Sequence, residues 1–224
     1  MPEPLTLDQL PVTALTGVGP ALAKKLAKLA ICTVQDVLFH LPLRYQDRTK
    51  VTPIGALQAG QDAVIDGEVR LADIMFGKRR SLACRIQDGT GTVTLRFFHF
   101  SAAQKNQLSP GTLIRCYGEV RRGTSGFELY HPEYSVVNAQ QPPPTEATLT
   151  PVYPSSEGLS QLSWRKLSEQ ALLLMQQHQP QEYLPQQHSR GVALAQALQY
   201  LHRPPSNADQ AALSAGLHPH QQRL

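Results

Sequence analysis

The sequence predicts an α+β protein in which an N-terminal helical hairpin and C-terminal helices flank a five-stranded antiparallel barrel. Two observations support this prediction. Apolar residues recur at helical spacing within residues 1–50 and again within residues 161–224, whereas residues 51–138 alternate between apolar and polar positions. The proline-rich residues 139–160 are typical of an extended linker between the barrel and the C-terminal helices.

The N-terminal hairpin is predicted from a glycine turn and two short helices. The turn Leu15–Pro20 puts Pro20 near the start of a helix, in which Leu22, Leu26 and Leu29 share one face. Thr33 then caps a second helix, with Asp36 at the capping-box position, and Pro42 ends it.

A Gly-x-Gly turn that leads into a lysine-bearing helix resembles a helix-hairpin-helix element. Such turns direct backbone N–H groups at a phosphate, which makes Lys24 and Lys25 candidate phosphate ligands. The alternative is a plain helical hairpin with solvated lysines. The sequence leaves the two open.

The barrel is predicted from five alternating segments, residues 63–74, 81–88, 92–100, 112–121 and 127–137. One helical stretch, residues 101–108, separates the third segment from the fourth. This is the element order of the OB-fold, a small barrel whose second and third strands bind oligonucleotides in many members. The fold also binds sugars and proteins, so it does not decide the function.

The third strand of this barrel carries three of the six phenylalanines. Alternation sends Leu95 and Phe97 to one face and Arg96, Phe98 and Phe100 to the other, so that large rings occupy both faces. Flat rings beside arginine are used for base stacking on single-stranded nucleic acid. Phe97, Phe98 and Phe100 are therefore candidate stacking residues, and the alternative is that all three fill the core.

The basic residues predict where an anionic partner would bind. A net charge of +4 permits such a partner without requiring one. Six basic residues lie on the third strand or at the two predicted hairpin tips, and we interpret them as phosphate contacts without sequence information. They are Lys78, Arg79, Arg80, Arg96, Arg121 and Arg122.

Several function classes are disfavoured by the sequence. No carboxylate pair, catalytic triad or metal-ligand spacing stands out, so no catalytic or metal-binding residue is predicted. Gly77-Lys78 is not a phosphate loop, because Arg79 follows where Ser or Thr is required and Ala72 stands where the first glycine belongs. Three widely spaced cysteines in apolar runs predict buried, reduced thiols of a soluble cytoplasmic protein, and neither a signal peptide nor a membrane span is expected.

The C-terminal segment is predicted to be helical, with Trp164, Leu167, Ala171 and Leu174 on one face of a helix. We interpret Trp164 as a packing residue rather than a base stacker. A glutamine-rich loop, residues 176–188, then leads to a short apolar helix, residues 192–202.

Eight segments together resemble the N-terminal region of the bacterial RecG branched-DNA helicases. They run in order along the chain: Leu15–Pro20, Leu38–Pro42, Arg44–Arg48, Gln87–Gly91, Arg96–Phe98, His131–Tyr134, Pro151–Pro154 and Leu201–Pro205. In that family this region is the wedge domain with its flanking helices, and the motor domains that use ATP and magnesium follow it. The chain ends before any motor motif, so we expect no ATP hydrolysis from it alone.

The resemblance implies a specific role. The parent enzyme would be an ATP-dependent translocase that regresses stalled forks and processes Holliday junctions in a bacterial, nucleoid-associated setting. The wedge would bind branched DNA and split its arms, with Phe97 and Phe98 on unpaired bases. An alternative from another class is a docking module that binds the acidic tail of a single-strand-binding protein.

Overall fold

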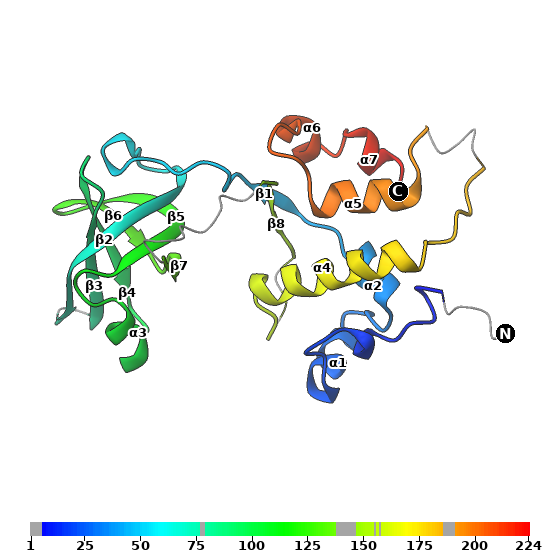
Figure 1. Ribbon diagram of the computed structural model, residues 1–224, viewed down its shortest axis with the longest axis horizontal. Helices are drawn as coiled ribbons and strands as arrows, with labels where there is room; N and C mark the ends of the chain where they lie inside the picture. Colours follow the sequence, from blue (N-terminus) through cyan, green and yellow to red (C-terminus); the bar gives the residue numbers. More distant parts are fainter. Residues whose placement is uncertain (1–5, 77–78, 138–146, 155, 157, 186–190) are drawn as a thin grey trace. The chain divides into compact units, whose positions relative to one another are not determined.

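The computed structural model describes residues 6–76, 79–137, 147–154, 156, 158–185 and 191–224. The chain forms two compact units (Figure 1). One, here called the helical unit, combines Met1–Asp47 with Ala147–Leu224, and the other, the barrel unit, is Arg48–Glu146.

The helical unit is built from short helices and one small sheet. Its first part contains the 3-10 helix η1 (Val12–Ala14), the helices α1 (Pro20–Ala27) and α2 (Val34–Phe39), and the strand β1 (Arg44–Gln46). Its second part contains β8 (Thr150–Val152), α4 (Gln161–Gln177), α5 (Leu194–His202), α6 (Gln210–Ser214) and α7 (Pro219–Gln222). β1 and β8 pair antiparallel, with Arg44 opposite Val152.

The local signals in the N-terminal hairpin are confirmed. Pro20 is the first residue of α1, and Gly17 takes the left-handed conformation (φ +87°) that the turn requires. Thr33 caps α2 by accepting from the Asp36 N–H, while the Asp36 carboxylate accepts from the Thr33 N–H. Among the described residues before Gly17, the 3-10 helix η1 is the one helix.

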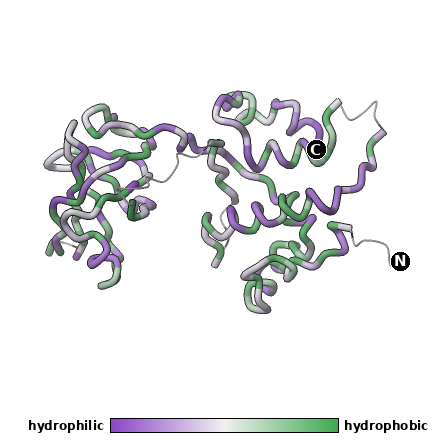
Figure 2. Tube along the Cα trace, in the orientation of Figure 1, coloured by the Kyte–Doolittle hydropathy of each residue, from purple (hydrophilic) through white to green (hydrophobic). Residues whose placement is uncertain are grey.

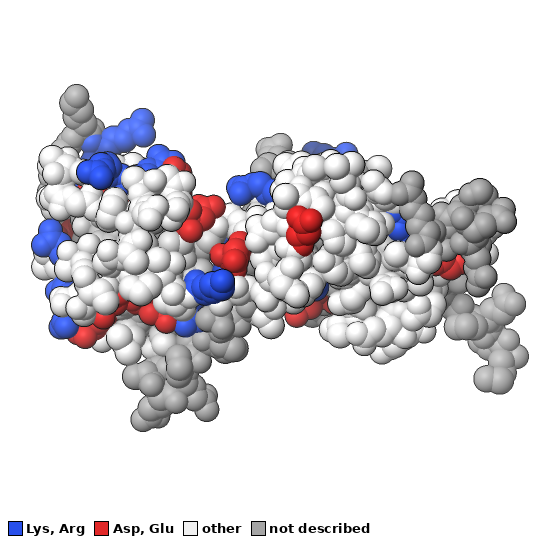
Figure 3. All heavy atoms as spheres, turned by 90° about the horizontal axis from the view of Figure 1, so that it is seen from above, with Lys and Arg blue, Asp and Glu red and all other residues white. Residues whose placement is uncertain are grey.

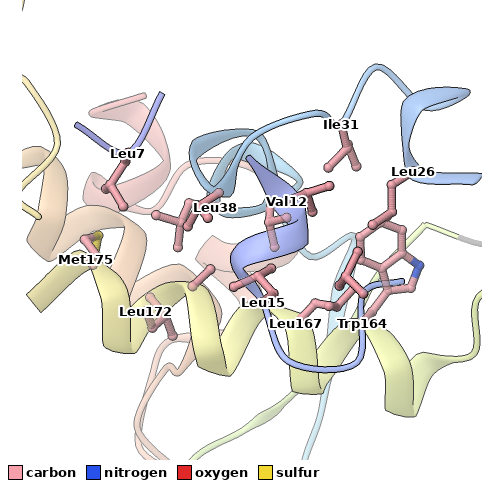
Figure 4. Close-up of a cluster of buried hydrophobic side chains, with 14 of the residues drawn as sticks. Leu7, Val12, Leu15, Leu26, Ile31, Leu38, Trp164, Leu167, Leu172 and Met175 are labelled. Carbon is pink, nitrogen blue, oxygen red and sulfur yellow. The ribbon is translucent and has the colours of Figure 1, made fainter. Parts of the chain in front are cut away.

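The two ends of the chain share one hydrophobic core. Leu7, Leu26 and Leu38 from the first part pack with Trp164 and Leu172 of α4 (Figure 4). The predicted division into a separate hairpin and a separate C-terminal segment is therefore wrong. A helix of eight residues and one of six cannot bury their apolar stripes alone, so each half of the unit covers the other.

The predicted linker is corrected in the same way. Thr150–Val152 is a strand, and Tyr153 and Leu159 are buried in the core of the helical unit. Residues 138–146 lie outside the described residues. α4 begins at Gln161, where Ser160 caps it, and its glutamine-rich end remains helical to Gln177.

The barrel unit has the predicted element order. After the short 3-10 helix η2 (Ile54–Ala56) come β2 (Asp62–Met75), β3 (Ser81–Gln87), β4 (Thr92–Phe97), α3 (Ala102–Gln107), β5 (Leu113–Gly123), β6 (Gly126–Tyr130) and β7 (Glu133–Val136). β2 pairs with β3 and β5, β3 with β4, β4 with β6, and β6 with β5, so five strands close into a ring. α3 lies between the third and fourth strands of the ring.

The predicted fifth strand is divided into β6 and β7. Both pair with the same strand, β5, through Val120–Gly123 and Ile114–Tyr117 respectively. The interruption falls at His131 and Pro132, where His131 has φ +47° and Pro132 has no N–H to donate. Hydrophobic and hydrophilic residues alternate along the barrel strands (Figure 2).

The cysteines confirm part of the sequence interpretation. Cys84 and Cys116 are buried in the barrel core, and burial raises the pKa of the Cys84 thiol to about 12. Cys32 is exposed, contrary to the prediction, because it lies in the loop between α1 and α2. Among the described residues, no helix is both long enough and apolar enough to cross a membrane.

Candidate nucleic-acid interface

The structure separates the three phenylalanines of the third strand. Phe97 is 2% exposed and belongs to the barrel core with Val93 and Leu95. Its ring meets the ring of Tyr134 edge-on at 5.8 Å. Base stacking by Phe97 is thus a mistaken prediction for this fold, since both faces of a core ring are covered by protein.

Phe98 directly follows the last residue of β4 and is only half-buried. Its ring meets the ring of Tyr130 edge-on, with 5.5 Å between centroids, and the ring of His131 at 5.6 Å. Arg96 shares its side of the strand, which makes this the outer face of the barrel. Phe98 therefore keeps the accessibility that a base-stacking residue needs.

Tyr130 extends this aromatic surface and was not singled out by the sequence. It pairs with Arg96 across the parallel β4–β6 ladder and is 39% exposed. The Arg121 guanidinium lies over its ring, 5.4 Å from the centroid. The sequence shows a tyrosine near the end of the predicted fifth strand. It does not show that this strand lies beside the aromatic third strand, so Tyr130 could be identified only from the strand pairing.

Phe100 occupies an intermediate position. It packs against the barrel core while remaining half-buried, and the Arg80 guanidinium lies 5.0 Å from its ring centroid. A cation over an aromatic ring resembles the environment in which arginine stacks on nucleobases. Stacking by Phe100 stays a prediction.

Arg96 is engaged by a carboxylate. Its guanidinium donates to both oxygens of Glu128, at 2.7 and 3.1 Å, and Glu128 is 5% exposed. The hydrogen bonds from Arg96 hold the pKa of Glu128 below its usual range. A bidentate pair of this kind fixes β4 to β6, and a phosphate would have to compete with it.

The other basic candidates differ in their side-chain partners and in their exposure. Arg121 pairs with Glu119 at 2.6 Å, and the Arg122 guanidinium lies 6.0 Å from the Phe127 ring centroid. Arg79 and Arg80 are exposed beside the β2–β3 hairpin tip, whereas Lys78 lies outside the described residues. In Figure 3 the basic side chains over the barrel are interspersed with acidic ones.

Lys24 and Lys25 are exposed on α1, in the helical unit. The structure therefore assigns them to a different compact unit from the aromatic surface of the barrel. Their interpretation as phosphate contacts stays a prediction.

Two carboxylates of the barrel have structural partners. Asp88 accepts from the N–H groups of Ile54, Thr90 and Gly91; burial opposes its ionisation, but these bonds outweigh it and lower its pKa. Glu133 pairs with Arg48 at 2.7 Å. Within the described part of the chain, no group of three His, Cys, Asp or Glu side chains is arranged to hold a metal ion.

Comparison with known proteins identifies the family of this chain. The family model described as the RecG wedge domain matches residues 11–175. The chain belongs to the RecG wedge-domain family. It is 50% identical to the ATP-dependent DNA helicase RecG of Escherichia coli K12 over 219 residues, and 45% identical to that of Pasteurella multocida.

The match covers only part of those relatives. In both comparisons it takes in 97% of this chain and 32% of the relative, so the chain spans about a third of their length. A solved structure described as RecG bound to a three-way DNA junction superimposes with a TM-score of 0.70 at 24% identity. The superposition covers 90% of this chain and 28% of the solved chain. It supports the fold described for the two units.

Proposed function

We propose that this RecG wedge binds the branch point of forked or junction DNA and separates its strands, as part of an ATP-dependent helicase acting on the bacterial chromosome. The observation that carries the proposal is the outer barrel face, where half-buried Phe98 meets exposed Tyr130 beneath Arg121. Aromatic rings with an arginine are the combination that stacks on unpaired bases. The relative solved with a three-way junction supports branched DNA as the ligand.

The energetics suit a wedge. Stacking of a base on an aromatic side chain contributes about 1–3 kcal/mol. One step of DNA stacking contributes about 1.4 kcal/mol on average. Phe98 would thus replace the stacking that a base loses at the branch, and the exposed arginines would hold the backbone without reading sequence.

We infer that the ATP-driven movement along DNA comes from another part of the helicase. ATP and magnesium would be used by a part of the helicase beyond the matched third, because these 224 residues contain no Gly-Lys-Ser or Gly-Lys-Thr. The chain's own contribution would be to bind and hold open the branch.

A titration of the chain with labelled DNA tests the proposal. We expect a three-way fork to bind more tightly than a linear duplex of the same length and at the same salt concentration, with no DNA-stimulated hydrolysis of ATP. Equal affinity for fork and duplex contradicts branch recognition. Hydrolysis by the purified chain contradicts the assignment of the motor to another region.

A second candidate function rests on the outward side of β2. Leu71 and Met75 are 47% and 50% exposed there, and Arg85 is the β3 partner of Leu71. A cation beside apolar contacts suits the acidic tail of a single-strand-binding protein. A tail peptide that displaces forked DNA would show that one surface serves both ligands, whereas simultaneous binding would place them on different surfaces.

A further inference from the structure

His131 directly follows β6 and is held by two hydrogen bonds, one to Arg96 of β4 and one from Phe98, the residue after β4. Its backbone N–H donates to the Arg96 carbonyl at 2.9 Å. Its side-chain Nε2 accepts from the Phe98 N–H at 3.2 Å. His131 thus joins the two backbone groups that flank Phe97.

The second bond replaces a bond of the parallel ladder. Thr94, Leu95 and Arg96 pair with Glu128, Leu129 and Tyr130, so the next pair in register is Phe97 with His131. In a regular parallel ladder the His131 carbonyl would accept from Phe98. Here His131 adopts φ +47°, and the imidazole serves as the acceptor instead.

The ring also contacts the aromatic side chains around it. It lies 5.6 Å from the Phe98 ring, meets the core ring of Phe97 edge-on at 6.1 Å, and stacks with His99 at 6.0 Å. A non-glycine residue with positive φ is held by its surroundings, and such residues concentrate at functional sites. The imidazole therefore connects the barrel core with the outer aromatic face.

We propose that His131 is a positioning residue for Phe98: its Nε2 fixes the end of β4 so that the Phe98 ring is presented to a base. This inference rests on the proposed function, because it concerns the same aromatic surface. The proposal gives the role to the His131 imidazole rather than to its left-handed backbone conformation. Without the acceptor, the Phe98 N–H would turn to water and the ring would lose its fixed orientation.

Three substitutions at His131 separate the side-chain role from the backbone role. Glutamine places an acceptor near the position of Nε2, whereas asparagine is too short to reach Phe98 but tolerates positive φ well. Glycine removes the side chain and the backbone strain together. A purely structural need for positive φ would favour glycine and asparagine, and a need for the acceptor would favour glutamine.

The test compares fork and duplex affinity of the full 224-residue chain, with 2-aminopurine at the branch to report stacking. We expect H131N and H131G to lose at least about fivefold of the fork preference, as F98A does, which corresponds to about 1 kcal/mol. H131Q should retain both the preference and the 2-aminopurine signal. The double variant H131N/F98A should lose no more than F98A alone.

Two results would overturn the inference. Either H131N keeps the wild-type preference, or H131Q loses as much as H131N although thermal unfolding shows both folded. The outcome for F98A keeps the two proposals apart. If F98A leaves fork preference unchanged, base stacking by Phe98 in the proposed function fails; if F98A loses it and H131N does not, only the positioning role fails.

Discussion

Phe97 and Phe98 are adjacent residues with opposite roles in the barrel. Phe97→Ala should destabilise the barrel by about 3–5 kcal/mol, because it removes a ring from a closely packed core. Phe98→Ala should cost much less, about 1 kcal/mol from its ring contacts with Tyr130 and His131, and should weaken fork binding more than duplex binding. Urea unfolding and DNA titration of both variants measure this, and a large loss of stability in Phe98→Ala would show that its ring is part of the core.

The alternation of the third strand placed these two rings on opposite faces. Val93 and Leu95 accompany Phe97, whereas Thr94 and Arg96 accompany Phe98, so hydrophobicity favours the Phe97 face as the inner one. The parallel pairing of β4 with β6 decides it, by putting Arg96 beside Tyr130 on the outside. That pairing joins residues more than thirty positions apart and has no local signal.

His202 gives the helical unit a predictable pH dependence. Its ring is fully buried: Nε2 lies 2.8 Å from the Leu38 carbonyl, and Nδ1 lies 2.8 Å from the Tyr153 hydroxyl. The carbonyl can only accept, so His202 donates through Nε2, and the Tyr153 hydroxyl beside Nδ1 donates to Ser168 Oγ. Desolvation lowers its pKa from 6.5 to about 4.

Because the folded state binds the His202 proton more weakly than the unfolded state, stability should fall as pH decreases below about 6.5. The stabilisation is complete above that pH, and by pH 5 about 2 kcal/mol should be lost. Burial also lowers the pKa of His40, which adds to the slope in the same direction. Urea unfolding between pH 7.5 and 5 measures the slope, and an equal slope in His202→Gln would exclude His202 as its source.

At the scale of elements, the basic residues between β2 and β3 are expected to contribute charge without sequence specificity. Replacing Lys78, Arg79 and Arg80 by Ala should weaken binding to fork and duplex by similar factors. Each lost phosphate contact should reduce the log–log salt slope by at most about 0.9. Binding titrations at several salt concentrations measure this, with Lys105→Ala on exposed α3 as a control that removes a single exposed charge. An unchanged slope would favour a merely solvated turn.

Elements with local signals were predicted well from sequence, and elements that depend on distant partners were not. The Thr33–Asp36 capping box and the strand order around α3 are confirmed because turn and cap residues act over a few positions. β8 was taken for linker, since its pairing with β1 depends on residues about a hundred positions away. The break at His131 was missed although Pro132, which has no N–H to donate to a ladder, marks it in the sequence.

For the whole molecule, the barrel unit is one continuous segment, whereas the helical unit is assembled from both ends of the chain. Fold class and barrel topology followed from composition and periodicity. The joining of the two ends did not, because hydrophobic periodicity shows that a helix has an apolar face without showing what covers it. The core of the helical unit therefore depends on residues of both segments, such as Leu38 and Trp164.

This dependence predicts how the chain responds to a truncation. Removing residues 1–47 should unfold α4, because Trp164, Leu167 and Leu172 would lose the apolar partners that cover them. The barrel unit should keep its structure, since its core includes none of the removed residues. Hydrogen exchange measured separately for α4 and for the barrel strands reports both outcomes, and protected α4 amides in the shortened chain would contradict the shared core.

A single substitution tests the same dependence in the intact chain. Leu38 is fully buried against the second half of the unit, so Leu38→Ala should destabilise the helical unit by about 2–5 kcal/mol. Leu43→Ala is the matched control, because Leu43 is 73% exposed and its loss should change stability by less than about 0.5 kcal/mol. In Leu38→Ala, amides of α4 should exchange faster while those of β3 and β4 keep the wild-type rate, because the two hydrophobic cores share no residue. Equal acceleration in α4 and in the barrel strands would mean that the two units unfold as one.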